Sequence, residues 1–308
     1  MTSCSIIIYN YESLHFLKAC VRQIRKYAHP EIEQHIIIAE QSNETSNKEV
    51  WALYGKDPDI TIVNMKAICS GYAIDFIMRF VNINSEYICT LDVDAFPIDA
   101  NWLYKSIEKL QEGFSFVGVH ADIESAYAKY GNFFCMSQYF RVGRTEDYKM
   151  LSLEAGFTRF THRWQIPTSG SIKIPIINFK NNEWAQRARE LNEDGWSDSG
   201  VTAHWWEDRH TENNKFCYAI THTIGEHGRE PLYGRITGGL VFHFGFSFTS
   251  IGSEGNMGER YLEWTRRIKE DFSDELIEEM LAACQPIYSP IPEEVWDGKV
   301  KKKLIIES

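Results

Sequence analysis

Two carboxylates stand two positions apart in the sequence, at Asp92 and Asp94, directly after the apolar run of residues 87–91. Side chains two residues apart on a strand point to the same face, so both carboxylates face one site if the extended backbone continues to Asp94. Two such charges repel each other unless a cation lies near them. Hard divalent metals bind through one or two carboxylates together with substrate phosphates. The pair therefore predicts a metal site, and the simpler alternative is an acidic turn after a strand.

A series of apolar runs and helical patterns must position this pair. Strands that alternate with helices indicate a parallel sheet that helices cover on its faces. Ligands bind such sheets beyond the carboxyl ends of the strands, which is where Asp92 and Asp94 come. The runs typical of buried strands are residues 5–9, 35–39, 60–63, 87–91 and 114–119, and helical spacing occurs over residues 14–24, 74–81 and 102–111.

The rest of the chain has a weaker pattern, and residues 120–194 show no clear period. No internal repeat or low-complexity linker divides the sequence. We therefore expect one α/β domain with a mostly parallel central sheet over residues 1–250, and a helical C-terminal appendage over residues 251–308. Helices are predicted at residues 182–191, 201–209, 257–271 and 274–284, the last one capped by Ser273, and short strands at residues 216–221 and 239–244.

Charge and cysteine content exclude several classes of protein. The 308 residues carry a net charge of -11, so the chain lacks the basic surface that nucleic-acid binding usually needs. An anionic ligand would need a metal ion to bridge it to such a chain. The seven cysteines are odd in number and form no C-x-x-C pair, which argues against a zinc site or a disulfide framework. We find no signal-peptide pattern and no apolar run of membrane-spanning length, and we expect a reduced, cytoplasmic protein.

Four elements in the first 110 residues resemble, in order and spacing, those of the inverting glycosyltransferases of family 2, which have the GT-A fold. In the family the second strand usually ends in Asp, whereas this chain has Glu40, which leaves its contact with the nucleotide base open. The match is looser from Trp196 to Gly245. The four segments are residues 5–12 (the first strand and its Tyr-Asn turn), 36–42 (the second strand), 64–75 (the turn and helix after the third strand) and 91–94 (the Asp-x-Asp motif).

The resemblance implies a nucleotide-diphosphate sugar, linked to UDP, GDP or dTDP, as the donor, and Mn²⁺ or Mg²⁺ as the cofactor. A saccharide or glycoconjugate would be the acceptor, and one displacement would invert the anomeric centre. Asp94 would coordinate the metal, and Asp92 would share it or contact the ribose. Residues 1–118 would be the nucleotide-sugar-binding half and residues 119–250 the acceptor half. The donor-binding residues that the resemblance implies are Tyr9, Asn10, Glu12, Glu40, Gly71 and Asp92.

An inverting transferase needs a general base, and Asp198 is the candidate that the resemblance indicates. A base takes the proton from the acceptor hydroxyl as the anomeric carbon is attacked. Asp198 precedes the predicted helix of residues 201–209, whose dipole would keep the carboxylate ionised. The same position suits an ordinary helix cap, so both interpretations stay open. Glu207 and Asp208 are the nearest competing acids.

His243 stands in the apolar run of residues 239–244, where the family often has a histidine that faces the metal and the diphosphate. A neutral imidazole can complete an oxygen-rich metal site. A lone histidine in an apolar run is more often a core residue, but the order of the elements favours the metal role. Further candidates, each with an ordinary structural alternative, are Lys66, Arg141 and Arg235 for phosphates and Trp196 for carbohydrate stacking.

Other functions compete with this hypothesis. A nucleotidyltransferase that makes sugar nucleotides usually has a Gly-rich basic loop after its first strand, and residues 9–13 have neither feature. Residues 91–96 also resemble the metal motif of Y-family DNA polymerases, but four strand-like runs precede them and the net charge opposes duplex binding. A non-catalytic sugar-nucleotide-binding protein is the third alternative, and the joint presence of Asp92, Asp94, Asp198 and His243 argues against it.

Overall fold

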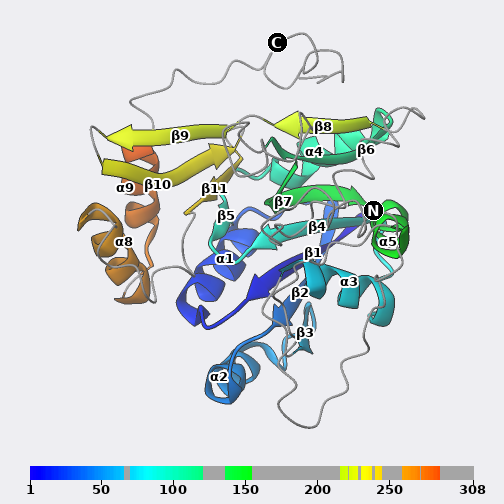
Figure 1. Cartoon of the computed structure of the whole chain (residues 1–308), viewed down its shortest axis with the longest axis horizontal. Helices are drawn as coiled ribbons and strands as arrows, with labels where there is room; N and C mark the ends of the chain where they lie inside the picture. Colours follow the sequence, from blue (N-terminus) through cyan, green and yellow to red (C-terminus); the bar gives the residue numbers. More distant parts are fainter. Residues whose placement is uncertain are drawn as a thin grey trace, which may run out of the picture.

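The computed structural model describes residues 1–65, 70–120, 136–154, 216–220, 222–227, 230–237, 240–244, 259–270 and 272–284. Strands and helices alternate over the first 120 residues, as the sequence predicts, and further strands and two helices follow late in the chain (Figure 1). The described strands form one sheet of seven strands and one of four.

Four parallel strands form one half of the large sheet, in the order β3-β2-β1-β4. Their isoleucines are buried in succession rather than alternately, because helices cover both faces of the sheet. All four strands run in the same direction, so their carboxyl ends meet at one edge. The strands are β1 (Thr2–Asn10), β2 (Ile32–Glu40), β3 (Ile60–Asn64) and β4 (Tyr87–Asp92).

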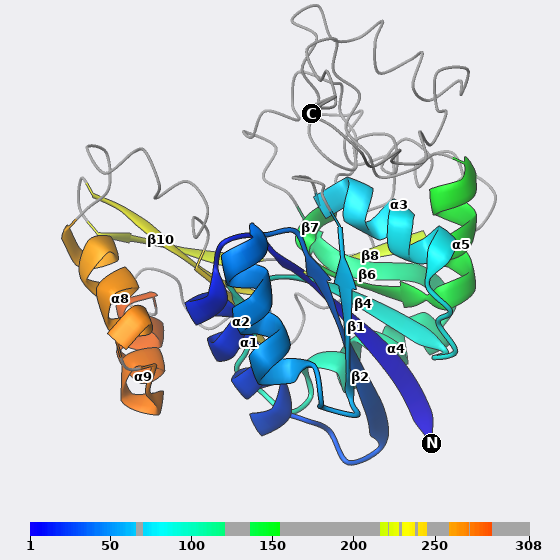
Figure 2. The same ribbon diagram turned by 90° about the horizontal axis from the view of Figure 1, so that it is seen from below.

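Helices lie on both sides of this sheet (Figure 2). Two of them, α1 and α4, bury apolar side chains in the larger core cluster, whereas α3 and α5 bury theirs in a second cluster on the other face. Among the residues of α2, only Val50 is buried, so this helix lies at the periphery. The helices are α1 (Leu14–Lys26), α2 (Glu44–Tyr54), α3 (Ser70–Phe80), α4 (Trp102–Gln111) and α5 (Thr145–Glu154).

The other half of the large sheet consists of β7, β6 and β8, with bounds Met136–Arg144, Phe114–His120 and Phe216–Ile220. β7 lies antiparallel between β4 and β6, whereas β8 is parallel to β6. In the described part of this sheet, β7 is therefore the one strand that runs against the others. The expected α/β class and mostly parallel central sheet are confirmed.

A small antiparallel sheet begins directly after β4, and the sequence did not predict it. Its strands pair in the order β5-β11-β10-β9. Only β11 had a sequence signal, since it falls inside the apolar run of residues 239–244. The strands are β5 (Ala95–Pro97), β11 (Val241–His243), β10 (Glu230–Thr237) and β9 (His222–His227).

Two late helices, α8 (Glu259–Glu270) and α9 (Asp274–Cys284), pack against α1 and the small sheet. Both were predicted, and the Ser273 hydroxyl accepts the N–H of Leu276 at 3.2 Å, as a helix cap does. Arg22 and Lys26 of α1 form ion pairs with Asp274. The boundary expected at residue 250 stays a prediction. Across the described ranges, none of the helices has the length and apolar content needed to cross a membrane.

The sequence did not predict several elements, namely α2, α5, β5, β7, β9 and β10. α2 has a single buried side chain, so its sequence carries little apolar periodicity. β5 is only three residues long, which is too short for a pattern. The helices predicted at residues 182–191 and 201–209 lie outside the described residues.

Candidate metal centre

The strand β4 ends at Asp92, and Val93 and Asp94 form a turn that leads into β5. The extended backbone therefore does not continue as far as Asp94. The chain turns here because β5 leaves the large sheet and pairs with β11 instead. This turn, rather than the alternation of a strand, sets the direction of the Asp94 side chain.

The pairing of β5 with β11 brings a residue from late in the chain to this turn. His243 lies opposite Ala95 in the ladder. The backbone N–H of Phe244 donates to the carbonyl of Asp94 at 2.9 Å, and the N–H of Ile98 donates to the carbonyl of Leu240 at 2.9 Å. Backbone hydrogen bonds on both sides of the pair thus fix where His243 lies relative to Asp94.

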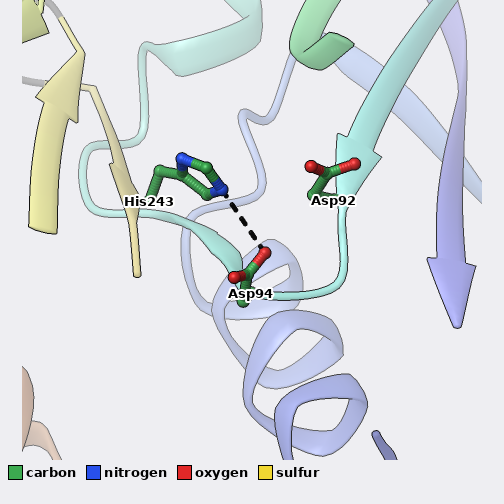
Figure 3. Close-up of side chains that lie close together, drawn as sticks. All are labelled: Asp92, Asp94 and His243. Atoms are coloured by element: carbon green, nitrogen blue, oxygen red, sulfur yellow. Dashed lines mark ion pairs between the residues drawn. The ribbon is translucent and has the colours of Figure 1, made fainter. Parts of the chain in front are cut away.

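The side chains of Asp92, Asp94 and His243 converge on one space (Figure 3). One ligand atom from each lies within 4.8 Å of the other two. His243 Nε2 is 3.5 Å from Asp94 Oδ1, which is longer than an N–H···O hydrogen bond. Asp94 is 5% exposed, and the other two residues are half-buried. The predicted metal residues are therefore brought together.

The donor set fits a hard divalent cation. Two carboxylates that share a partly buried space need a compensating positive charge. Oxygen ligands with one imidazole suit Mg²⁺ or Mn²⁺, and three protein ligands leave further positions of an octahedral ion for phosphate oxygens. The negative field of the pair reaches α1: burial raises the pKa of the Cys20 thiol well above its ordinary value, and the charges of Asp94 and Asp92 add to that rise.

The helix α1 packs against the residues that follow the turn. The Cys20 thiol donates to the carbonyl oxygen of Ala95 at 3.3 Å, and Phe16 stacks on Phe96 with ring centroids 6.4 Å apart. Both contacts are to residues that directly follow Asp94 in β5. The turn is thus held by packing as well as by the β5–β11 ladder.

Beside the metal centre, Asn10 and Glu40 tie the carboxyl ends of β1 and β2 together. Asn10 Nδ2 donates to Glu40 Oε2 at 2.6 Å, and the backbone N–H of Ser42 donates to Glu40 Oε1 at 2.7 Å. Both Asn10 and Glu40 are fully buried. Both carboxylate oxygens of Glu40 therefore accept hydrogen bonds from protein groups, and the side chain faces no solvent.

Glu12 holds the adjoining loop. Its φ of 52° is in the left-handed region, and its N–H donates to the hydroxyl of Ser42 at 2.8 Å. Its carboxylate accepts from the backbone N–H and the side-chain amide of Asn43, both at 2.7 Å. Asn43 in turn caps α2 by accepting from the N–H groups of Thr45 and Ser46. The loops after β1 and β2 therefore form one hydrogen-bonded unit.

Comparison with models of known protein families gives one match. Residues 5–163 match the model of the family described as glycosyl transferase family 2, which is more than half of the chain. The chain belongs to glycosyl transferase family 2. Its mostly parallel α/β sheet is the one expected of the GT-A fold. No curated protein sequence matches it.

Several solved structures resemble this family 2 chain at low identity. They include a mannosyltransferase from Pyrobaculum calidifontis in complex with GDP-Man and Mn²⁺ (14% identity, TM-score 0.40), the galactosyltransferase LgtC with donor and acceptor sugar analogues (13%, 0.36) and S. aureus TarS (11%, 0.37). The matches cover 64%, 47% and 51% of this chain and 53%, 59% and 50% of those proteins. Similarity of that strength assigns neither a donor nor an acceptor here.

The remaining predicted residues of the family 2 chain fall into two groups. Tyr9 is buried beside Asp92 in the β1–β4 ladder, and Gly71 is buried in the first turn of α3. Arg141 is 1% exposed, with its guanidinium over the ring of Phe116 at 5.8 Å. The backbone of Arg235 pairs with His243. The candidates that lie outside the described residues are Asp198, Glu207, Asp208, Lys66 and Trp196.

Sequence reasoning missed Tyr139 of β7. Its ring is 3% exposed and stacks on the His243 imidazole, with centroids 4.0 Å apart and an interplanar angle of 12°. The residue falls in the segment without clear periodicity, so no local pattern identified it. Only the folding of β7 alongside β4 places this ring beside a residue of the small sheet.

Proposed function

We propose that this chain transfers a sugar from a nucleotide-diphosphate donor to an acceptor hydroxyl, with Mn²⁺ or Mg²⁺ held by Asp92, Asp94 and His243. The observation that carries the proposal is the convergence of these three side chains at the carboxyl ends of the parallel strands in a family 2 chain. The acidic composition supports it, because an anionic donor then needs a bridging cation.

Each residue of the centre has a defined task. Asp94, the most buried of the three, and His243 offer one oxygen and one nitrogen ligand, and the β5–β11 ladder keeps them together. Asp92, at the very end of β4, shares the metal or contacts the ribose. When bound, the cation neutralises charge on the diphosphate and so helps the nucleotide to leave.

Asp198 is our proposed general base, with helix capping as its structural alternative. It would accept the proton of the acceptor hydroxyl while the hydroxyl oxygen bonds to the anomeric carbon and the bond from that carbon to the diphosphate oxygen breaks. A single displacement of this kind inverts the anomeric centre. A positioned base contributes about 10²- to 10⁴-fold to the rate.

The loops after β1 and β2 are our proposed nucleotide-binding surface. Hydrogen bonds of Glu12, Asn10 and Glu40 join the two loops, and we propose that these three residues shape the surface. Tyr9 of β1 and Gly71 of α3 are our further proposed donor-binding residues. We also propose a reduced, cytoplasmic location, which the free, buried thiols of Cys4, Cys20 and Cys89 support.

The test is calorimetric titration of UDP, GDP, dTDP and CDP with and without Mn²⁺, on the wild type and on Asp94→Asn. We expect one nucleotide to bind tightly, only with the metal, and to lose that binding in the variant. The matching nucleotide sugars are then assayed for release of the nucleotide diphosphate with a panel of saccharides. Failure of every nucleotide to bind would overturn the transferase proposal, and binding without turnover would favour a non-catalytic sugar-nucleotide-binding protein.

A further inference from the structure

The imidazole of His243 lies against an aromatic ring. A histidine that ligates a metal almost always donates its other ring N–H to a carboxylate, a carbonyl or a water, which fixes the ring. His243 Nδ1 is buried, and among the residues that the structure describes none hydrogen-bonds to it. Another contact must therefore set the plane of this imidazole.

Tyr139 supplies that contact. The two rings lie 4.0 Å apart at their centroids and are inclined by only 12°. Tyr139 is itself fixed, because it is 3% exposed and belongs to β7, a strand of the large sheet. The β4–β7 ladder pairs Leu91 with Phe140, so the next position along the register sets Tyr139 beside Asp92.

The parallel geometry leaves the metal-binding atom of His243 accessible. The lone pair of Nε2 lies in the plane of the imidazole, and a ring stacked on its face does not obstruct that direction. In the structure Nε2 is directed toward Asp94 Oδ1, at 3.5 Å (Figure 3). Tyr139 thus fixes the ring without competing for the metal.

The stack also becomes more favourable when a cation is bound. Coordination draws electron density from the imidazole and makes its face more positive. The face of a tyrosine ring is negative and attracts positive charge, with about 0.5–2 kcal/mol at stake in cation–π contacts. Tyr139 therefore stabilises the coordinated form of His243 over the free form.

We infer that Tyr139 is a positioning residue for the metal centre, one that orients His243 and raises the affinity for the divalent cation. The inference rests on the proposed function, since it requires His243 to be a metal ligand. It adds a residue from the large sheet to a centre whose imidazole comes from the small sheet.

The experiment compares Tyr139→Phe, which keeps the ring, with Tyr139→Leu, which removes it. The probe is Mn²⁺ alone, without nucleotide. Its affinity is measured from the electron paramagnetic resonance signal of the free ion, and the ¹⁴N coupling of the bound ion reports a coordinated imidazole. His243→Ala identifies that coupling. Tyr148→Leu is the matched control, because Tyr148 is another fully buried tyrosine, whose ring packs on Phe116.

We expect Tyr139→Leu to weaken Mn²⁺ binding about tenfold and to reduce the ¹⁴N coupling, as loss of an outer partner does for other metal histidines. Tyr139→Phe and Tyr148→Leu should stay within about twofold of the wild type on that scale. Tyr139→Met replaces the leucine variant if the latter does not melt cooperatively.

Two results separate this inference from the proposed function. Wild-type affinity and ¹⁴N coupling in a folded Tyr139→Leu would overturn the positioning role and leave the metal centre intact. A wild-type protein whose bound Mn²⁺ shows no coupling dependent on His243 would remove His243 from the metal site, and the role of Tyr139 with it.

Discussion

The backbone N–H of Phe244 donates a hydrogen bond to the carbonyl oxygen of Asp94. Phe244 directly follows His243, so this bond joins the backbone beside one proposed ligand to the backbone of another, where the turn before β5 meets the end of β11. Since main-chain groups hold Asp94 and His243 together, changing either side chain should leave the two strands paired. Metal binding and folding can therefore be measured separately.

Replacing Asp94 with asparagine should abolish metal binding and stabilise the metal-free protein. Asp94 and Asp92 face each other's charge in a partly buried space, and the substitution removes that repulsion. We expect the melting temperature in EDTA to rise by about 2 °C, as a gain near 1 kcal/mol gives in a chain of this size. Scanning calorimetry in EDTA and in Mn²⁺ measures both effects.

The control for this variant is Asp59→Asn, which changes the same charge at an exposed position. It should leave both the metal-free melting temperature and the rise caused by Mn²⁺ unchanged. A wild-type protein with no Mn²⁺-dependent rise would contradict the metal centre, because a ligand that binds only the folded state must stabilise it.

Replacing Glu40 with glutamine should weaken nucleotide binding although the carboxylate faces no solvent. Its two oxygens accept from Asn10 Nδ2 and the Ser42 N–H, and an amide N–H₂ would meet one of these donors. A mismatched buried pair costs about 1–3 kcal/mol. Urea denaturation gives the stability, and calorimetry gives the nucleotide dissociation constant.

Glu33→Gln is the matched control, because Glu33 is exposed on the same strand, β2. It should change neither quantity. Unaltered stability in Glu40→Gln would mean that the buried network contributes nothing. A stability loss with unaltered nucleotide affinity would show that these loops do not form the nucleotide surface.

Stability should fall between pH 6.5 and pH 4 because of His15. Burial, followed by the charges of Lys269 and Lys18, lowers the pKa of His15 to about 4. The His15 side chain binds a proton near pH 6.5 in the unfolded chain but only near pH 4 in the folded chain. As the pH drops through this interval, protonation therefore stabilises the unfolded state relative to the folded state.

His15→Phe keeps a ring against Phe16 and removes the titration. We expect its free energy of unfolding to lose about 1–2 kcal/mol less than that of the wild type between pH 7 and pH 4.5, an allowance being made for partial exposure. Chemical denaturation at both pH values measures the difference. Parallel pH profiles for the two proteins would exclude this role of His15.

The late helices should be held by their aromatic contacts and not by their ion pairs. Trp264 is 2% exposed and lies 6.5 Å from the ring of Phe244, next to His243 in sequence. Trp264→Ala should cost about 3–5 kcal/mol by urea denaturation. Asp274→Asn, which removes exposed ion pairs with Arg22 and Lys26, should change nothing measurable. A larger loss of stability in Asp274→Asn than in Trp264→Ala would show that the ion pairs hold these helices.

The first half of the fold followed from sequence because its signals are local. Runs such as Ile6 to Ile8 are apolar on both faces, and the helix α1 repeats its buried residues at helical spacing. Asp92 and Asp94 were identified through their position after such a run, His243 through its place in the run of residues 239–244, and all three through the family resemblance. The structure then brought all three together.

The parts that escaped prediction depend on partners distant in sequence. The turn at Asp94 arises because β5 pairs with β11, which three residues of sequence cannot show. Tyr139 gains its position from β7 and its contact from β11, and neither is visible around residue 139 itself. Glu40 was a donor-binding candidate through the family resemblance, and the sequence around it does not show its buried hydrogen bond with Asn10 of another strand.

The late position of His243 has a consequence during protein synthesis. A ribosome makes β4 and the turn after it, with Asp92 and Asp94, long before it makes β11, so a nascent chain holds both acids while His243 does not yet exist. The three proposed ligands can meet only after β11 has been made and has paired with β5. Unfinished chains therefore lack one of the three proposed metal ligands until β11 has been translated.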